Sequence, residues 1–349
     1  MTAGRPRVGR RLAVLRRRGL LAALGLLADQ SFGEVPDGVH PVALFGRTMQ
    51  RIERVLWHDS VPAGALYAAT GVGMAVLAGR TVGSTAAATW ICSAQRGLGE
   101  AAMAVSGALG RGDLQMARAL LPSLVGRDPA TLGHDEIARA VVESVAENTV
   151  DAVIAPVLWA VAGGATGAAA HRAVNTLDSM VGRRGSRYGR FGRASARLDD
   201  VAAWVPARVT AALVVTVRPW LAGPILAAVL TDAPGHPSPN AGVAEAAFAA
   251  ALEVRLGGTN RYPEGVRTGP ILGSGRAPDV SDIRRAVRLS EQVTAALAGL
   301  LVLPSLLVLP SAARSTVRSA ARSTVEPASW SLPRSLPPGR RWSRRRGRC

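Results

Sequence analysis

The stretch ESVAENTVDAVIAPVLWAVAGGATGAAAHRAVNTLDSMVG, residues 143–182, sets acids and amides directly against a long apolar run and closes that run with a second polar cluster. Charged groups in or beside a membrane segment are costly, and they persist mainly where a cavity, an ion or a polar ligand compensates them. This stretch therefore predicts a membrane helix with a chemical site beside it.

The composition around this stretch is that of a membrane bundle. The 349 residues are 48% hydrophobic but only 4% aromatic, and Ala and Gly are abundant, as in helices that pack closely through small residues. Apolar runs near the ~20 residues that span a bilayer predict an all-α, polytopic membrane helix bundle of about four to five spans. The candidate runs are 19–28, 62–79 with a weaker hairpin partner at 81–94, 152–170, 201–230 and 293–309.

Charge divides the chain into three parts. The formal net charge is +18, but residues 1–18 carry seven Arg and no acid, and residues 311–349 carry ten Arg and one Glu. Basic ends beside apolar segments indicate contact with anionic lipid and argue against nucleic-acid binding. We expect a basic segment at 1–18, an integral membrane domain at 19–310 with amphipathic surface helices, and a disordered Arg/Ser/Pro-rich tail at 311–349.

All 42 basic residues are Arg, and this excludes two mechanisms. A phosphate loop of the GxxxxGK[ST] type needs its Lys, and a pyridoxal-phosphate enzyme needs a Lys to form the Schiff base. The chain alone provides neither, so no pyridoxal phosphate is expected. The two cysteines, Cys92 and Cys349, show no metal-ligand spacing.

The first polar cluster is a row of acids. Glu143, Glu147 and Asp151 recur at i, i+4 and i+8, which places them along one face of a helix. A Mg²⁺ ion carrying nucleotide phosphates would relieve their mutual repulsion, and Asn148 could orient a ligand beside them. The alternative is a solvated helix face with no ligand.

The second cluster follows the apolar run. Asn175 and Asp178 share a helical face, and Arg172 precedes them with a guanidinium that could hold phosphate. Asp199 and Asp200 repeat the combination of acid and Arg, with Arg197 before them and Arg208 after Pro206, and we expect only one of the two acids to point into the site. Helix capping by Asn, Thr, Asp or Ser near the end of a span is the alternative for the residues after the apolar run.

Two further motifs contain candidate ligands. In HPVALFGR, residues 40–47, His40 is the titratable group, although a lone His is more often structural. In HPSPNAGVAEAAFAAALEVRLGG, residues 236–258, a Pro-rich turn with Asn240 leads into a helix carrying Glu245. We expect that helix to be capped by the glycines at 257–258.

These motifs, in this order, resemble the adenosylcobinamide-phosphate synthase family of cobalamin biosynthesis, CobD/CbiB. The resemblance covers roughly residues 20–305 and extends to RFGRASARLDDVAAWVPARVTA at 190–211. It implies an inner-membrane enzyme, an acid–amine ligase, that joins the propionate carboxylate of adenosylcobyric acid to (R)-1-amino-2-propanol phosphate. ATP and Mg²⁺ are the implied cofactors, the active face is expected to be cytoplasmic, and other enzymes of the pathway are possible partners.

The resemblance turns the polar residues into a candidate site. The implied catalytic group is Glu143, Glu147, Asp151 and Asp178, the first three also being the candidate Mg²⁺ ligands. The implied substrate-binding residues are His40, Asn148, Arg172, Asn175, Arg197, Asp199, Arg208, Asn240 and Glu245. Three places depart from the family pattern: GEVPDG at 33–38, the arginines at 183–184, and Trp204.

Two other classes of function stay open. A transporter for a corrinoid or another anionic solute would use intramembrane acids as a substrate or proton path. The chain shows no inverted or parallel repeat of its apolar segments, and its acids lie at the predicted span ends, which weakens that interpretation. A non-catalytic membrane scaffold would tolerate replacement of the acids.

Overall fold

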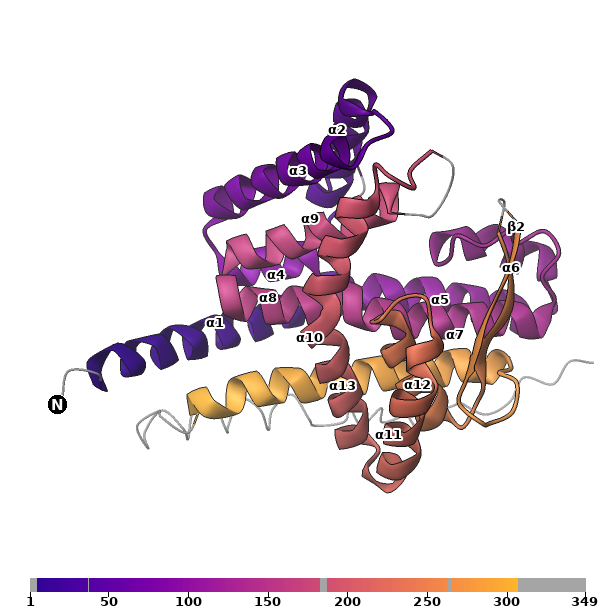
Figure 1. Cartoon of the computed structure of the whole chain (residues 1–349). Coiled ribbons are helices and arrows are strands. Elements are labelled where there is room, and N and C mark those ends of the chain that lie inside the picture. The colour runs from indigo at the N-terminus through magenta and orange to yellow at the C-terminus, as the bar shows by residue number, and fades with distance from the viewer. Residues whose placement is uncertain (1–4, 37, 183–186, 263–264, 307–349) are drawn as a thin grey trace, which may run out of the picture. The chain divides into compact units, whose positions relative to one another are not determined.

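The computed structural model describes residues 5–36, 38–182, 187–262 and 265–306, and within these ranges the chain is almost entirely helical (Figure 1). The chain divides into two units, Met1–Ser305 and Leu306–Cys349, and the predicted tail falls outside the described ranges. The elements are α1 (Arg5–Phe32), α2 (Pro41–Leu56), α3 (Val61–Val82), α4 (Thr85–Cys92), α5 (Gln95–Gly110), α6 (Leu114–Leu120), η1 (Leu121–Ser123), α7 (His134–Thr149), η2 (Val150–Ile154), α8 (Ala155–Gly163), α9 (Ala165–Val181), α10 (Arg193–Val217), η3 (Pro219–Leu221), α11 (Ala222–Thr231), η4 (Ala233–Gly235), α12 (Ala241–Leu252), β1 (Leu256–Tyr262), β2 (Gly265–Leu272) and α13 (Val280–Leu306).

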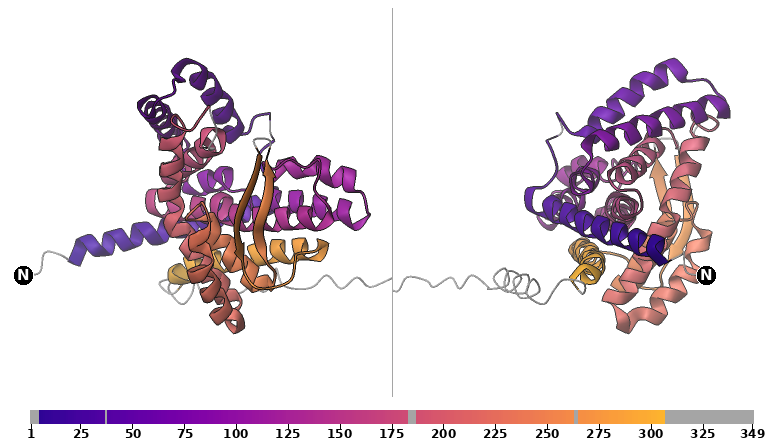
Figure 2. Two further views of the ribbon diagram at one scale, coloured as in Figure 1. Left: turned by 45° about the vertical axis from the view of Figure 1, so that its right-hand side comes forward. Right: turned by 90° about the vertical axis from the view of Figure 1, so that its left-hand side faces the viewer.

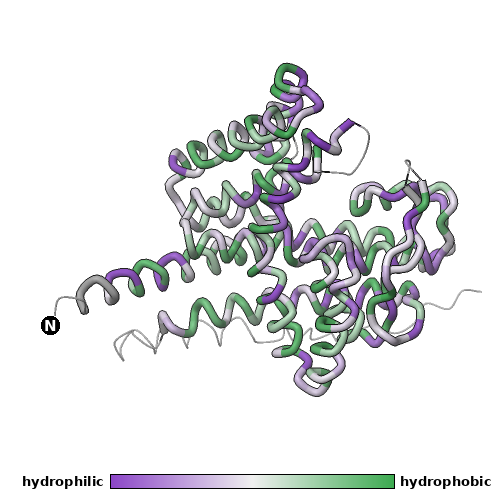
Figure 3. Tube along the Cα trace, viewed as in Figure 1, coloured by the Kyte–Doolittle hydropathy of each residue, from purple (hydrophilic) through white to green (hydrophobic). Residues whose placement is uncertain are grey.

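The helices confirm the membrane fold. Within the described ranges, four are long and apolar enough to cross a bilayer: Val61–Val82, His134–Gly163, Arg193–Val217 and Val280–Ser305. Figure 3 shows hydrophobic stretches along α3 and α13, and alternating polar and apolar turns on the first half of α1. Residues 9–17 of α1 are exposed, and this part of the helix projects beyond the neighbouring helices (Figure 2). Helix α1 runs unbroken across the predicted boundary at 18–19.

Several predicted boundaries change. The run at 152–170 is not one span, because Gly164 adopts φ +66° and separates α8 from α9. The two helices pack against each other as a hairpin, and Gly167 lies so close to the Trp159 carbonyl that a Cβ would be 2.1 Å from it. The run at 201–230 divides into α10 and α11, and the turn between α3 and α4 falls at Gly83 instead of Arg80.

A two-stranded antiparallel hairpin, β1 and β2, is the one departure from the all-helical prediction in the described part of the chain. Helix α12 ends at Leu252, and Glu253 takes the left-handed cap position with φ 57°. The predicted cap at Gly257 is wrong, because this glycine opens β1, where positive φ and the Pro270 carbonyl exclude a side chain. The hairpin stands beside α5–α7 in Figures 1 and 2.

Candidate functional site

Helices α7 and α8 form one continuous helix through the π-turn η2, and this helix carries Glu143, Glu147 and Asp151. Ala155 N–H donates to the Val150 carbonyl five residues back, and Pro156 follows without an N–H to continue the α-helical pattern. The Ala152 carbonyl, four residues before Pro156, accepts instead from Ala94 N at 3.0 Å. Single π-turns occur often at functional sites, and this one includes Asp151.

Proline affects α10 in the same way. Pro206 lies inside α10 and cannot donate to the Ala202 carbonyl one turn earlier. Trp159 on α8 supplies the missing hydrogen bond, with its Nε1 at 3.0 Å from the Ala202 oxygen. Both interrupted helices are therefore held to a neighbour by a hydrogen bond at the interruption.

Asn175 on α9 connects these two helices at their carboxylates. Its Nδ2 donates to Asp151 Oδ2 at 3.2 Å and lies 3.4 Å from Asp199 Oδ1 on α10. Asp151 and Asp199 form no ion pair with any residue that the structure describes. The amide thus holds two carboxylates from different helices near each other without neutralising either of them.

Two further acids, Asp178 and Glu147, lie near Asp151 and Asp199. The charges of both act on Asp199, and Glu147 is exposed. The Asp178 carboxylate lies over Gly182, where a Cβ would be 1.8 Å from Asp178 Oδ1. The Asp178 carboxylate can occupy this position only because residue 182 has no side chain. We name the set of Glu147, Asp151, Asp178 and Asp199 the acidic cluster.

Glu143, at the start of the row, has a different environment. Its side chain is buried, its Oε2 pairs with Arg127, and its Oε1 accepts from Gly257 N at 2.7 Å. Arg139, one turn earlier on α7, donates to the Thr259 carbonyl at 2.9 Å. Glu143 consequently fastens α7 to the preceding loop and to β1, with both carboxylate oxygens bonded.

This geometry changes the expected metal site. Glu143, Glu147 and Asp151 do not converge, and no three His, Cys, Asp or Glu residues in the described ranges are grouped so as to hold a metal ion. The predicted three-carboxylate ligand set is therefore not formed. The geometric reason is that Glu143 turns toward Arg127 and β1 while Asp151 turns toward Asn175.

Helix α12 brings a further acid toward Glu147. Glu245 is buried, and its Oε1 lies 3.8 Å from Nε2 of His236. His236 Nδ1 lies 3.1 Å from Ser238 N, which donates to it in the tautomer that leaves Nε2–H toward Glu245. Burial, reinforced by the charges of Glu143 and Glu147, raises the pKa of Glu245 well above its ordinary value.

Arg208 and Asn240 bond to each other. Arg208 Nη1 donates to Asn240 Oδ1 at 2.9 Å, and its guanidinium stacks over the Trp204 ring at 4.4 Å. Asn240 Nδ2 donates to the Asp200 carbonyl at 2.8 Å. Asn240 therefore joins the turn before α12 to α10 at two positions, Asp200 and Arg208. Trp204, a departure from the family pattern, is the platform for the guanidinium.

The other predicted ligands are placed apart from the acidic cluster or bonded locally. His40 caps α2, with Nδ1 accepting from Val42 N at 3.2 Å. Asn148 Nδ2 donates to the Ser144 carbonyl one turn back at 2.9 Å. Arg197 is exposed on α10, and Arg172 lines an apolar cavity on another side of α9.

Two residues near the acids were not predicted, His236 and Arg127. The motif HPSPN begins with His236, and its position before Pro237 in a turn was the available signal. Gly242 allows His236 to pack against α12, since a Cβ at 242 would be 2.5 Å from the His236 Cβ. Arg127 lies in a loop that carries no motif, so its pairing with Glu143 depends on the tertiary fold.

Comparison with known proteins identifies the family of the chain. The family model described as CobD/Cbib protein matches residues 22–290. The chain belongs to the CobD/Cbib family. No solved structure matches it.

Members of the CobD/Cbib family resemble it over most of their length. The cobalamin biosynthesis protein CobD of Mycobacterium bovis is 47% identical over 304 residues, covering 83% of this chain and 97% of that protein. The protein of the same name from Mycobacterium tuberculosis H37Rv is 48% identical over 299 residues, covering 82% and 95%. That of Geobacter metallireducens is 41% identical over 294 residues, covering 78% and 92%. The acidic cluster lies inside the region matched by the family model.

Proposed function

We propose that this chain acts in cobalamin biosynthesis as an ATP-dependent acid–amine ligase of the membrane. The reaction joins a propionate carboxylate of adenosylcobyric acid to the amine of (R)-1-amino-2-propanol phosphate and yields adenosylcobinamide phosphate. Membership of the CobD/Cbib family supports the pathway. The observation that carries the proposal for the site is the bridge from Asn175 to Asp151 and Asp199, which have no cationic partner in the described structure.

The acidic cluster suits the charges of this reaction. The incoming amine arrives as an ammonium, which a carboxylate attracts and from which it can accept a proton. Mg²⁺ is commonly held by one or two carboxylates together with phosphate and water oxygens, so Asp151 and Asp199 fit such an ion without a third protein acid. ATP with Mg²⁺ would supply the activation of the substrate carboxylate. Asn175 keeps the two acids in place before any ligand arrives.

Two arginines on α10 are the candidates for binding substrate anions. Arg208 is oriented by Asn240 and by the Trp204 ring, and Arg197 is exposed on the same helix. Both lie on α10, which also carries Asp199, so they are the candidates for binding phosphates or propionates of the substrates. Glu245 and His236 border Glu147 from the turn and helix at 236–252.

We place the protein in the cytoplasmic membrane with the acidic cluster facing the cytoplasm. ATP is available on that side, and the Arg-rich segment at 1–18 is expected there by the positive-inside rule. Other enzymes of cobalamin biosynthesis would deliver the corrinoid and the amine at the same surface. Protease accessibility of an epitope placed at residue 2 in sealed inverted vesicles tests this orientation.

The direct test is formation of the amide. Membranes carrying the chain are incubated with adenosylcobyric acid, Mg-ATP and aminopropanol phosphate, and the product is measured by mass spectrometry. We expect product that requires ATP and is lost in Asp178→Asn at equal protein abundance. Asp135→Asn is the matched control, because Asp135 is exposed in the first turn of α7 and away from the acidic cluster. Normal turnover by Asp178→Asn would remove Asp178 from the site.

One observation favours transport as a second candidate. Glu147, Asp151 and Asp199 lie inside helices long enough to span a membrane, and not at span ends as the sequence predicted. Intramembrane acids of this kind can mark a substrate or proton path. Absence of amide product from folded protein, together with corrinoid uptake into vesicles that depends on Asp151, would favour the transporter.

A further inference from the structure

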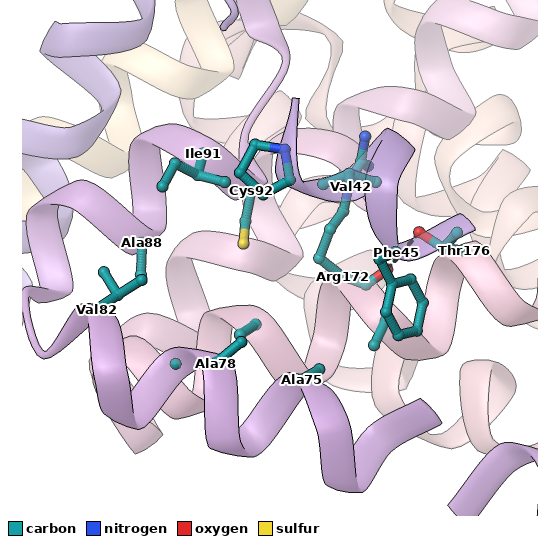
Figure 4. Close-up of a pocket in the computed structure, with 14 residues that line it drawn as sticks. Val42, Phe45, Ala75, Ala78, Val82, Ala88, Ile91, Cys92, Arg172 and Thr176 are labelled. Atoms are coloured by element: carbon teal, nitrogen blue, oxygen red, sulfur yellow. Dashed lines mark hydrogen bonds between the residues drawn. The ribbon is translucent and has the colours of Figure 1, made fainter. Parts of the chain in front are cut away.

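An apolar cavity of about 130 Å³ lies between α2, α3, α4 and α9, on a side of α9 that does not include Asn175 (Figure 4). Ala, Val, Phe, Ile and Pro side chains form most of its lining. Arg172 is the only charged residue in that lining, and no acid accompanies it. Arg172 is partly exposed, so its guanidinium is accessible beside an otherwise apolar wall and has no counter-charge in that lining.

The guanidinium of Arg172 has no partner among the described residues. Its Nε is buried and makes no hydrogen bond, and no ion pair involves Arg172 in the described ranges. Its close neighbours are neutral. Burial raises the pKa of the Cys92 thiol to about 11 and lowers the pKa of His171 to about 3, so neither offers an anion at neutral pH.

A second feature adds positive potential at the same place. Pro41 and Val42, the first two residues of α2, line the cavity, so the N-terminus of this 16-residue helix borders it. The helix dipole gives this end a partial positive charge. The start of α2 therefore adds a weak positive potential beside Arg172, while the Val42 N–H itself is bonded to His40 Nδ1.

The cavity opens on a surface that faces lipid. Met74, Ala78 and Val82 recur at i, i+4 and i+8 on α3, a candidate membrane span, and all three are exposed. Ala78 and Val82 line the cavity. A lipid chain beside α3 can enter between these side chains without crossing the helix bundle.

We propose that this cavity is a binding site for one anionic phospholipid, whose phosphate pairs with Arg172 while a segment of one acyl chain occupies the apolar part. A guanidinium binds phosphate oxygens through two parallel hydrogen bonds, and the apolar lining matches a hydrocarbon chain. The site is separate from the acidic cluster, and the proposal does not depend on the ligase reaction.

Native mass spectrometry of the full chain, released from nanodiscs of phosphatidylcholine with a minor fraction of phosphatidylglycerol, tests this proposal without any substrate. We expect one phosphatidylglycerol to be retained by the wild type. Arg172→Gln should lower that retention about tenfold, the effect of losing one charge-assisted pair, and Arg172→Lys should restore part of it. Arg80→Gln is the matched control, because Arg80 is exposed on α3 and does not line the cavity.

A second pair of variants tests the apolar part. Ala78→Phe fills the opening from an exposed position, so it should remove the lipid without disturbing the core. Leu77→Phe, on the neighbouring exposed position outside the cavity, should leave retention unchanged. Equal retention by the wild type, Arg172→Gln and Ala78→Phe would overturn the proposal. Displacement of the lipid by aminopropanol phosphate or ATP would also overturn it, by assigning the site to a substrate.

Discussion

Glu143 and Asp151 lie about two turns apart on the continuous helix formed by α7, η2 and α8, yet their environments differ. Glu143 is bonded through both oxygens, to Arg127 and to the backbone of Gly257. Asp151 has one amide partner, Asn175, and otherwise acids around it. A carboxylate whose bonds are complete stabilises the fold, whereas one left among like charges is available to a ligand.

Among the four substitutions that test this comparison, Asp151→Asn should have the largest effect. The substitution keeps the shape of the side chain but removes one of the two charges that Asn175 holds together, and we expect amide formation to fall about 10³-fold or more. Product per unit of membrane protein measures the change. Retained abundance and an unchanged melting temperature would identify it as a loss of chemistry. Activity within about tenfold of wild type would contradict the comparison.

Glu143→Gln should act on stability. It removes the negative charge that pairs with Arg127, whose side chain is 12% exposed, and breaking a buried pair in this way costs about 3 kcal/mol. Thermal unfolding in detergent measures the loss. The double variant Arg127→Leu with Glu143→Leu should recover much of it. A stable but inactive Glu143→Gln would instead place Glu143 in the site.

Glu245→Gln tests how a buried carboxyl affects the pH dependence of stability. The folded-state pKa of Glu245 is raised, so the wild type loses stability as the pH rises through the unfolded value and onward to the folded one. The variant lacks this loss and should be more stable than wild type by roughly 1 kcal/mol at pH 8. The gain should shrink strongly at pH 4, where the carboxyl is mostly protonated in both states. Melting curves at the two pH values provide the measurement, and a gain that does not depend on pH would contradict the assignment.

Pro156→Ala should have the smallest effect. Restoring an N–H at 156 offers the Ala152 carbonyl an intrahelical donor in competition with Ala94, which relaxes the π-turn and shifts Asp151 relative to Asn175. We expect turnover to fall about tenfold, roughly 1.4 kcal/mol in the barrier, with little change in melting temperature. Hydrogen exchange at Ala94 N reports whether its bond is lost, and unchanged turnover with that bond lost would separate the π-turn from the chemistry.

The sequence predicted the helices whose extent depends on the length of an apolar run. It did not predict the breaks and strands that depend on backbone conformation. The run at 62–79 became a candidate span because nothing within it breaks a helix. The run at 152–170 was divided because Gly164 adopts positive φ, and the β-hairpin was missed because its glycines were taken for a helix cap.

For the site, local spacing identified residues but not their partners. Asn175 and Asp178 share a face of α9, as predicted from i, i+3 spacing, but Asp199 reaches Asn175 only because α9 and α10 pack together. Glu143 belongs to the same row by spacing, and its different environment arises from Arg127 and β1, which no helical period specifies. Tertiary contacts therefore separated residues that periodicity had grouped.

The carbonyls of Ala152 and Ala202, which have no donor within their own helices because of Pro156 and Pro206, also affect membrane insertion during synthesis. An open carbonyl in hydrocarbon costs several kcal/mol, so neither the segment around Ala152 nor the segment around Ala202 is a good membrane helix in isolation. In both cases the donor precedes the acceptor along the chain: Ala94 before Ala152, and Trp159 before Ala202. During synthesis from the N-terminus, each proline-containing helix therefore emerges after the donor that bonds its open carbonyl. The helices can insert in the order of translation, because neither carbonyl depends on a donor made later.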